Sequence, residues 1–314
     1  MRILLVVNPY ATNYDTQQRR VVEKALGSDH DLEVRETARP GHGLPITQGA
    51  VTDGFDTVVA WGGDGMVNEA AAGLAGTDVA LGILPGGSTN VCARTLGIPL
   101  DIVAAAGNLL RWLDEDRTRR IGLGSAGGRT FTFVCGLGFD AAVVREVEAR
   151  SALKRTIGPS VYLFGAVATF RNFDRHQPQF RLRFDDGSTS PPLFQAFVCN
   201  SSPYTYLGNL PMVIVPEAGY DQPLEILGLT RLAWVSTIRL GLSAFWHQRY
   251  LRASPYAFRA TADHLVVEEI VPFDVHQDAE YRGKRDSLEI SWMPECLSVY
   301  CGQGSSGTVR GRRG

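Results

Sequence analysis

The sequence has no long hydrophobic run and little excess charge, and both absences limit what the protein can be. No segment approaches the roughly 20 apolar residues that span a bilayer, and the aliphatic run Ile3–Val7 is too short for the core of a signal peptide. The formal net charge of −2 gives no global electrostatic reason to expect a nucleic-acid partner. We therefore expect a globular cytoplasmic protein, and the length of 314 residues suggests about two domains.

Cysteine and lysine are both scarce. The five cysteines are dispersed without a Cys-x-x-Cys spacing, which favours a reducing compartment and argues against a disulfide framework or a zinc site. None of the three lysines (Lys24, Lys154 and Lys284) stands in a Gly-Lys-Ser/Thr sequence, so the chain has no Walker A phosphate loop. A phosphate site in this chain would have to use another arrangement.

The first 122 residues alternate between strand and helix signals. Aliphatic runs without polar alternation occur at Ile3–Val7, Thr57–Trp61 and Val79–Leu84, and segments with helical patterns separate them, the last helix running from about Ser88 to Leu96. Strands of this kind are buried on both faces, and strands that alternate with helices form parallel sheets. We therefore predict a doubly wound α/β domain over residues 1–122.

From residue 123 the pattern changes to short alternating or aromatic strands separated by turn residues. Such strands predict a mostly antiparallel, sandwich-like β-rich domain over residues 123–303. Its predicted helices are Ala141–Ala149, Val161–Phe170 and Arg231–Tyr250, and its last four predicted strands are His264–Ile270, Phe273–Gln277, Ser287–Trp292 and Leu297–Tyr300. Residues 304–314 are small, polar and basic, and we expect a disordered tail.

A glycine-rich turn follows the strand that ends at Trp61. Gly62-Gly63-Asp64-Gly65 lies just before a predicted helix, at the edge of the sheet where α/β proteins bind ligands. Glycines let backbone amides approach a ligand closely, and a helix N-terminus favours phosphate. A carboxylate would repel polyphosphate unless Mg²⁺ lay between them, so we interpret Asp64 as a metal ligand. The alternative is an ordinary turn in which Asp64 caps the helix.

A second turn of the same kind makes the ligand-binding interpretation stronger. Leu84–Asn90 reads LPGGSTN and again joins an apolar strand to a helix. Two such turns at one edge of a sheet would form a cradle for phosphate. A third glycine-rich string, Gly122–Gly127, matches G-x-G-x-x-G, but a strand follows it instead of a helix, and we interpret it as a hairpin loop.

The two turns carry a family resemblance. Gly62–Glu69 reads GGDGMVNE and Pro85–Arg94 reads PGGSTNVCAR. In this order they resemble the diacylglycerol kinase catalytic domain family, which includes bacterial lipid kinases and sphingosine kinases and whose strings are close to GGDGTxNE and PxGTxNDxAR. Three further strings, which extend the resemblance over about residues 1–300, are Asn8-Pro9, the inter-domain helix around Leu153–Tyr162, and Asp278-Ala279-Glu280, which stands where the family has Asp-Gly-Glu.

The resemblance implies an enzyme that uses ATP and Mg²⁺ to phosphorylate a lipid hydroxyl, diacylglycerol-like or of a long-chain base. It implies Glu280 as general base and Asp64 as the other catalytic residue, with Asp64 and Asp221 as metal ligands. The implied nucleotide-binding residues are Asn8, Arg20, Thr37, Gly62, Gly63, Asp64, Gly65, Met66, Val67, Asn68, Gly87, Ser88 and Asn90. Because the substrate is a lipid, we also expect transient contact with the inner membrane face, to which Lys154-Arg155 beside an apolar helix would contribute.

Several residues depart from the family strings. Met66 stands for threonine, Val91 for aspartate, Ala279 for glycine, and Gln222-Pro223 for the Asp-Gly expected near a structural metal. These departures leave open a catalytically weak regulator that binds lipid or nucleotide. An NAD kinase relative is a further alternative, because that family shares the Gly-Gly-Asp-Gly turn. The late Asp-Ala-Glu hairpin and the segment Asn200–Asn209, which resembles an actinobacterial branch of the lipid kinases, argue against it.

Overall fold

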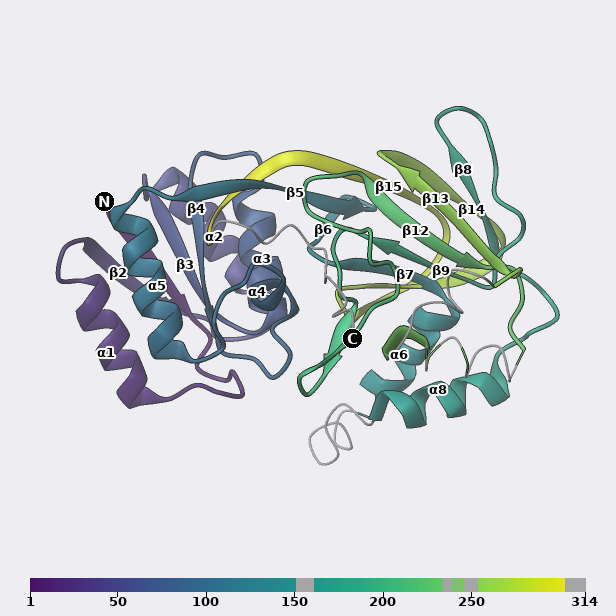
Figure 1. Cartoon of the computed structure of the whole chain (residues 1–314), viewed down its shortest axis with the longest axis horizontal. Helices are drawn as coiled ribbons and strands as arrows, with labels where there is room; N and C mark the ends of the chain where they lie inside the picture. Colours follow the sequence, from purple (N-terminus) through teal and green to yellow (C-terminus); the bar gives the residue numbers. More distant parts are fainter. Residues whose placement is uncertain (151–160, 234–238, 240, 242, 246–253, 303–314) are drawn as a thin grey trace, which may run out of the picture. The chain divides into compact units, whose positions relative to one another are not determined.

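A computed structural model describes residues 1–150, 161–233, 239, 241, 243–245 and 254–302. The chain divides into two compact units (Figure 1). The first unit is Met1–Leu123 together with Met293–Gly314, and the second is Gly124–Trp292. The sequence-based prediction places the domain boundary after residue 122, and the first segment of the first unit ends at Leu123. The predicted second domain, 123–303, nevertheless includes a C-terminal segment that belongs to the first unit.

The first unit is built on a parallel sheet with the strand order β2-β1-β3-β4. The end of β15, the last strand of the chain, adds to this sheet, where Val299 pairs with Leu81 in parallel. The helices and strands of this unit are β1 (Arg2–Val7), α1 (Thr16–Leu26), β2 (Asp31–Glu36), α2 (Gly43–Thr52), β3 (Thr57–Gly62), α3 (Asp64–Leu74), β4 (Ala80–Pro85), α4 (Val91–Thr95), α5 (Ile102–Asp114) and the start of β5 (Thr118–Ala126).

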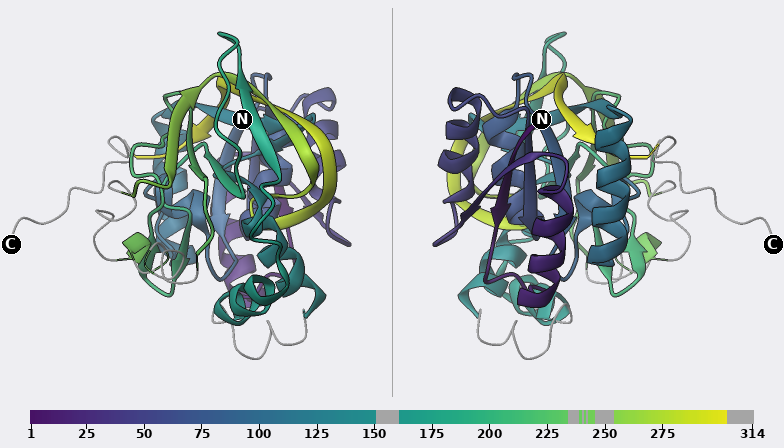
Figure 2. Two further views of the ribbon diagram at one scale, coloured as in Figure 1. Left: turned by 90° about the vertical axis from the view of Figure 1, so that its right-hand side faces the viewer. Right: turned by 90° about the vertical axis from the view of Figure 1, so that its left-hand side faces the viewer.

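Helices cover both faces of this sheet, as the uninterrupted aliphatic strands predict. Ile3–Val7 of β1 and Val58–Trp61 of β3 have no exposed surface. Helices α1 and α5 contact each other, as do α2 and α3, and the two pairs lie on opposite sides of the sheet (Figure 2, right). The doubly wound fold that the sequence predicts is therefore confirmed.

Helix α5 is absent from the sequence-based prediction, although its signals are in the sequence. Asp101 caps it, because its carboxylate accepts a hydrogen bond from the Ala104 amide at 2.9 Å. Its buried residues recur at helical spacing along one face, with Ile102, Ala105, Leu109 and Trp112 among them. The neighbouring helix α4 is shorter than expected and begins only at Val91, because Asn90 has a φ of 50°, outside the helical range.

The second unit is an antiparallel sheet with the order β13-β12-β9-β7-β14-β15, and β8 pairs with the first half of β14. The predicted β-rich domain is therefore confirmed. Its elements are β6 (Arg129–Phe131), β7 (Val134–Gly138), α6 (Phe139–Ala149), α8 (Val161–Asn172), β8 (Phe180–Phe184), β9 (Gln195–Cys199), β10 (Thr205–Leu207), β11 (Leu210–Met212), β12 (Leu224–Leu229), β13 (Ala257–Ala262), β14 (His264–Gln277) and β15 (Glu280–Tyr300), with the end of β5.

Two pairs of predicted strands are single long strands. His264–Ile270 and Phe273–Gln277 join in β14, which has a register shift between Glu268 and Phe273, and Ser287–Trp292 and Leu297–Tyr300 join in β15. A bulge bends a strand without ending it, so a local break in the polar pattern is no proof of a turn. Of the predicted helix Arg231–Tyr250, residues 231–233 are not helical, 239, 241 and 243–245 are helical, and the rest lie outside the described residues.

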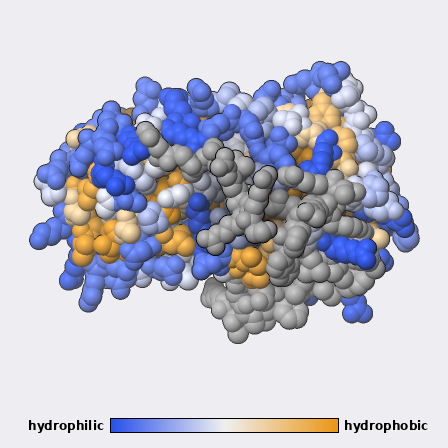
Figure 3. Space-filling view, viewed as in Figure 1, coloured by the Kyte–Doolittle hydropathy of each residue, from blue (hydrophilic) through white to orange (hydrophobic). Residues whose placement is uncertain are grey.

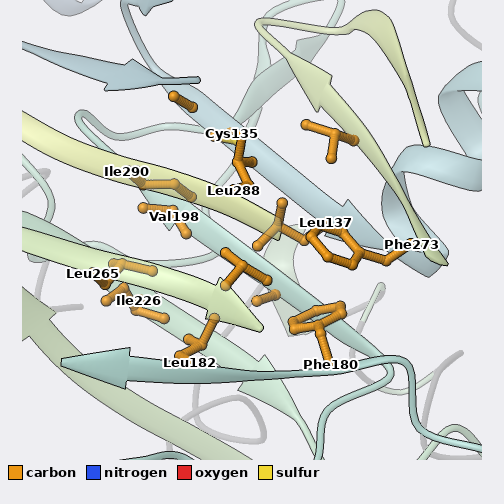
Figure 4. Close-up of a cluster of buried hydrophobic side chains, with 14 of the residues drawn as sticks. Cys135, Leu137, Phe180, Leu182, Val198, Ile226, Leu265, Phe273, Leu288 and Ile290 are labelled. Atoms are coloured by element: carbon orange, nitrogen blue, oxygen red, sulfur yellow. The ribbon is translucent and has the colours of Figure 1, made fainter. Parts of the chain in front are cut away.

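The core of the second unit is apolar and aromatic (Figure 4). The rings of Phe180 and Phe273 lie 5.2 Å apart, and both are fully buried. Phe131 also enters this core through the hairpin of β5 and β6, where a Cβ at its register partner Gly124 would overlap its ring. The G-x-G-x-x-G string at Gly122–Gly127 is therefore a hairpin, as predicted, and its glycine makes room for Phe131.

The hairpin of β14 and β15 turns through two residues that both have positive φ. Gln277 pairs with Glu280, and Asp278 and Ala279 between them have φ values of 48° and 62°. Positive φ at both central positions is the type I′ turn, which matches the twist of the strands and favours Asp-Gly or Asn-Gly. Ala279 therefore occupies a position that suits glycine.

Replacing Ala279 by glycine is expected to raise the free energy of unfolding by about 1 kcal/mol, because glycine adopts positive φ without steric cost. The change in the free energy of unfolding is measured from the shift in the urea midpoint, with the dependence on urea concentration unchanged. Ala260→Gly in β13 is the control, because its backbone is extended and glycine there should lower stability by about 0.5–1 kcal/mol. If Ala279→Gly and Ala260→Gly were both less stable than the wild type, the assignment of the turn would be contradicted.

Candidate active site

The carboxyl ends of the parallel strands in the first unit are joined by backbone hydrogen bonds. The Asn8 amide donates to the Trp61 carbonyl at 2.9 Å, and the Thr37 amide donates to the Val7 carbonyl at 2.9 Å. The Gly86 amide donates to the Gly62 carbonyl at 2.8 Å. Asn8, Thr37 and both glycine turns therefore lie at one edge of the sheet, the edge where ligands of open α/β sheets bind.

The two glycine turns touch each other through their backbones. A Cβ added to Gly87 would lie 2.6 Å from the Gly63 Cα, and a Cβ on Gly63 would lie 3.2 Å from the Gly87 Cα. A Cβ on Gly62 would lie 2.6 Å from the Met66 Cβ. No side chain fits at Gly62 or Gly87 without moving the backbone, so the close approach of the two turns requires glycine.

Helix α3 begins immediately after the first turn, with its N-terminal amides directed away from the helix. Its N-cap residue is Gly63, and no side chain caps the helix. The helix dipole places partial positive charge at this end, and the first-turn amides of a helix have no acceptor within it. The Asp64 Oδ1 accepts a hydrogen bond from the Cys92 amide of α4 at 3.2 Å, so its carboxylate also joins the two turns. The arrangement suits a phosphate group.

Asn90 braces the second turn. Its Oδ1 accepts from the Gly87 amide at 2.9 Å, and its Nδ2 donates to the Gly87 carbonyl at 2.7 Å. Asn13 adds a third bond, from its Nδ2 to the same carbonyl at 2.8 Å. Asn90 is buried and Ser88 is exposed, so Ser88 offers a hydroxyl at the surface while Asn90 fixes the shape of the loop.

Met66 and Val67 are buried, and their side chains belong to the packing of α3. A Cβ at Gly43 would lie 2.7 Å from the Met66 Cε, so the thioether packs against the start of α2. Gly65 and Asn68 are half-buried in the first two turns of the helix. The contribution of Met66 and Val67 to a bound nucleotide would therefore come from the backbone.

Glu69 is a structural residue that the sequence analysis passed over. Its two carboxylate oxygens accept hydrogen bonds from the Gly41 and Gly43 amides at 2.7 and 2.6 Å, where α2 begins. It fixes the loop after β2 to α3. The Asn-Glu at the end of the first family string was the available signal.

Arg20 is exposed on α1, and in the described part of the chain no hydrogen bond or ion pair joins it to the glycine turns. Its neighbour Arg19 is the anchored residue. The Arg19 guanidinium donates to the Tyr14 hydroxyl at 3.2 Å, to Glu23 at 2.5 Å and to Glu36. The hydrogen bonds from Tyr14, Glu23 and Glu36 raise the pKa of Arg19 further above its usual value. Arg19 therefore ties α1 to the end of β2.

Glu280 belongs to the second unit, at the first position of β15. Its side chain is exposed and accepts a hydrogen bond from the Arg282 Nη2 at 2.6 Å. The turn that carries it is held by Asp278, whose carboxylate accepts from the Thr132, Phe133 and Val134 amides at 2.6, 2.9 and 3.0 Å and from the Thr132 hydroxyl. Burial raises the pKa of Asp278, and these hydrogen bonds act in the opposite direction.

A buried polar cluster lies beside this hairpin, and the sequence analysis did not identify it. His276 is fully buried, and its Nε2 lies 2.6 Å from the Asp140 Oδ2 at the start of α6. The Tyr204 hydroxyl donates to Asp140 at 3.2 Å. A Cβ at Gly136 would overlap both His276 and Asp140, so a glycine in β7 makes room for the pair. Its hydrogen-bonded members come from three distant parts of the chain, so spacing could not have revealed it.

The structure gives no support to a preformed metal site. No group of three or more His, Cys, Asp or Glu side chains in the described residues could hold a metal ion. Asp221 is exposed in a turn before β12, and Asp64 belongs to the first unit. Mg²⁺ commonly uses one or two carboxylates with phosphate oxygens, so Asp64 suits a metal that arrives with a nucleotide.

Known proteins provide an independent comparison. Residues 2–126 match the model of the diacylglycerol kinase catalytic domain. A Chromohalobacter salexigens protein named "Probable lipid kinase YegS-like" is 36% identical over 180 residues, covering 56% of this chain and 55% of that protein. A Pseudomonas aeruginosa protein of the same name is 33% identical over 182 residues, covering 57% of each.

The family match covers the N-terminal segment of the first unit, Met1–Leu123, whereas solved structures align over both units. The crystal structure of a diacylglycerol kinase from Bacillus anthracis aligns with a TM-score of 0.70 and 19% identity, over 96% of this chain and 97% of that one. This likeness shows the fold. The chain spans about half the length of the curated relatives that it matches in sequence, 55% in the first case.

Gly136→Ala is expected to lower the free energy of unfolding by at least about 2 kcal/mol, because the new methyl group would separate His276 from Asp140 and leave buried polar groups unpaired. Urea unfolding measures it. Gly107→Ala is the matched control, because Gly107 is exposed in α5 with nothing within 4 Å of a new Cβ. The control should gain about 0.5–1 kcal/mol from helix propensity. Equal stability of the two variants would contradict the packing described for the cluster.

Proposed function

We propose that the protein is an ATP-dependent lipid kinase, which transfers the γ-phosphoryl group of Mg-ATP to the hydroxyl of a diacylglycerol-like lipid or a long-chain base. The observation that carries the proposal is the contact between two glycine turns at the ligand-binding edge of a diacylglycerol kinase catalytic domain. The YegS-like lipid kinase names of the curated relatives support the lipid as acceptor.

The first unit supplies the phosphate site. The uncapped N-terminus of α3 and the glycine backbone of both turns would receive the phosphates, with the Ser88 hydroxyl beside them. The side chains of Asn90 and Glu69 would act indirectly, because they hold the loops from which the amides point. Mg-ATP supplies the phosphoryl group and neutralises its charge, and Asp64 is the carboxylate that would hold the metal.

The second unit supplies the proton acceptor. A hydroxyl acceptor must lose its proton as phosphoryl transfer proceeds, and a positioned carboxylate can take it. Glu280 fits this role because it is exposed at the end of a hairpin whose turn is fixed by Asp278. The Arg282 Nη2 donates to the Glu280 carboxylate at 2.6 Å and would hold this side chain in position.

We further propose that the enzyme takes part in phospholipid metabolism and acts in the cytoplasm, in transient contact with the inner membrane face. Within the described ranges, no helix has both the length and the apolar character that crossing a membrane requires. A lipid kinase of this kind would have to reach its substrate from the surface of the bilayer. The predicted basic contact at Lys154-Arg155 and the predicted inter-domain helix around Leu153–Tyr162 fall mainly outside the described residues.

Glu280→Gln is expected to lower kcat at least about 100-fold while leaving the affinity for ATP unchanged, because the amide keeps the shape of the side chain and removes its basicity. Transfer of labelled phosphate from ATP to a bacterial lipid extract measures the first quantity, and calorimetry with ATP and Mg²⁺ measures the second. The mobility of the labelled lipid identifies the acceptor class.

Glu269→Gln is the matched control, because Glu269 is an exposed glutamate on β14 and should be silent. Asp64→Ala should abolish labelling through loss of the metal. Labelling that survives in Glu280→Gln would exclude Glu280 as the base. A wild-type protein that binds ATP and labels no lipid would instead be a regulator, which the departures at Met66 and Ala279 would then explain.

Gly87→Ala is expected to weaken ATP binding at least about tenfold, because a Cβ 2.6 Å from the Gly63 Cα would push the two turns apart. Calorimetry with Mg-ATP measures the affinity, and the urea midpoint shows whether the variant is folded. Gly107→Ala in the same unit should bind ATP as the wild type does. An unchanged affinity in a folded Gly87→Ala protein would place the nucleotide elsewhere.

A further inference from the structure

A small β-hairpin of the second unit carries exposed leucines at its tip. Thr205–Leu207 pairs with Leu210–Met212 in antiparallel register, with Gly208 and Asn209 as the loop. Leu207 and Leu210 are direct register partners, so their side chains lie on the same face. They are 47% and 38% exposed, respectively, on a strand pair that forms its own two-stranded sheet.

The base of the hairpin is firmly anchored while its tip is exposed. The Tyr204 amide donates to the Met212 carbonyl at 2.9 Å, and the Tyr204 hydroxyl donates to the Asp140 carboxylate at 3.2 Å. On the other strand, the Val213 amide donates to the Ala244 carbonyl at 2.8 Å, and Val213–Val215 is buried. An isolated two-stranded hairpin is marginally stable in water, so these anchors hold the leucines at the surface.

The hairpin carries no charge. Residues 187–216 contain no Asp, Glu, Lys or Arg, although one residue in five of the whole chain is charged. Tyr206 precedes the leucine tip on β10, whereas the Tyr204 hydroxyl is bonded to Asp140 at the base of the hairpin. A tyrosine next to aliphatic residues suits the boundary between lipid headgroups and acyl chains, where the ring is buried and the hydroxyl stays wet. A protein partner would normally be selected by charged groups around its apolar contact, and this hairpin has none.

The apolar area is also too small for a stable protein interface. The exposed parts of two leucines amount to on the order of 150 Å², far below the about 800 Å² per partner of a standard interface. On the face drawn in Figure 3, hydrophobic residues outside the grey atoms reach the surface only in separate areas. A small uncharged tip can still enter a bilayer surface, which needs no complementary shape.

We propose that the tip of the β10–β11 hairpin inserts shallowly into a lipid bilayer, with Leu207 and Leu210 as the inserted side chains. The inference rests on the proposed function only in that a lipid acceptor requires contact with a bilayer. Insertion itself needs neither ATP nor turnover. Because apolar insertion is not electrostatic, binding to neutral vesicles should persist at high salt, whereas binding through basic residues would be screened.

The test is co-sedimentation with phosphatidylcholine vesicles at high salt. The double variant Leu207→Ser/Leu210→Ser should lower the partition coefficient at least about tenfold. Val103→Ser is the matched control, because Val103 is 55% exposed on α5 of the first unit and should leave partition unchanged. In the single variant Leu207→Trp, the indole fluorescence of the protein should gain a blue-shifted component when vesicles are added.

Three outcomes would overturn the proposal. In the first, the wild-type protein fails to bind neutral vesicles, and in the second, the double variant partitions as strongly as the wild type. In the third outcome neither protein binds vesicles, and the wild type forms a dimer that the double variant does not form. Activity separates this proposal from the kinase proposal. On a monomeric short-chain lipid the double variant should match the wild type, and on vesicles it should be slower. Vesicle binding through the tip without any phosphorylated lipid would refute the kinase proposal and support the insertion.

Discussion

The contact between Gly63 and Gly87 is the constraint on which the candidate nucleotide site depends. Two strand-to-helix turns come within backbone contact there, and a single methyl group on Gly87 would separate them. Around this contact the surrounding residues act as braces: Asn90 and Asn13 hold Gly87, and the Asp64 carboxylate reaches the Cys92 amide. Phosphate recognition by backbone needs this accuracy, because amides cannot adjust as flexible side chains do.

The second unit relies on hydrogen bonds of side chains where the first relies on a backbone contact between glycines. It presents an exposed carboxylate, Glu280, at the end of a turn that the half-buried Asp278 holds in place. Asp278 accepts four hydrogen bonds from Thr132, Phe133 and Val134, so the turn is fixed from within. Beside it, the His276–Asp140 pair joins β14 to α6 in a space that only a glycine leaves open. Buried polar contacts of this kind rigidify the elements that they connect.

Most of the fold could be predicted from local pattern, because the relevant signals are short in range. Each of these signals depends only on residues that are close together in the sequence: the aliphatic runs, the glycine turns and the alternating late strands. The C-terminal strand itself was predicted at Leu297–Tyr300, but its return to the first unit could not be found this way, since Val299 pairs with Leu81 across most of the chain. A helix that begins at Val91 was predicted too early, because Ser88 and Thr89 look like caps while Asn90 takes a left-handed conformation.

The same distinction between short-range and long-range signals applies to the candidate site. Its glycines and Asp64 are contiguous in sequence, and a pattern can show them. The contacts that brace them are not: the hydrogen bonds from Gly41 and Gly43 to Glu69, and from Asn13 to Gly87, became visible only when distant segments were placed together. The same holds for the His276–Asp140 pair of the second unit. The family resemblance implies that Asn90 binds the nucleotide. In the structure its side chain forms two hydrogen bonds with Gly87 of its own loop. Long-range hydrogen bonds of this kind produce no periodic pattern in the sequence.

The departures from the family strings can now be weighed by what each side chain does. Met66 packs against α2, so the hydroxyl lost with threonine leaves the backbone amides of α3 in place. Ala279 costs stability at a positive φ, and the turn nevertheless closes with Glu280 exposed at its end. Neither change removes a carboxylate or opens the glycine contact. Because phosphoryl transfer depends mainly on positioning and charge, a chain that keeps both is better suited to catalysis than to regulation alone.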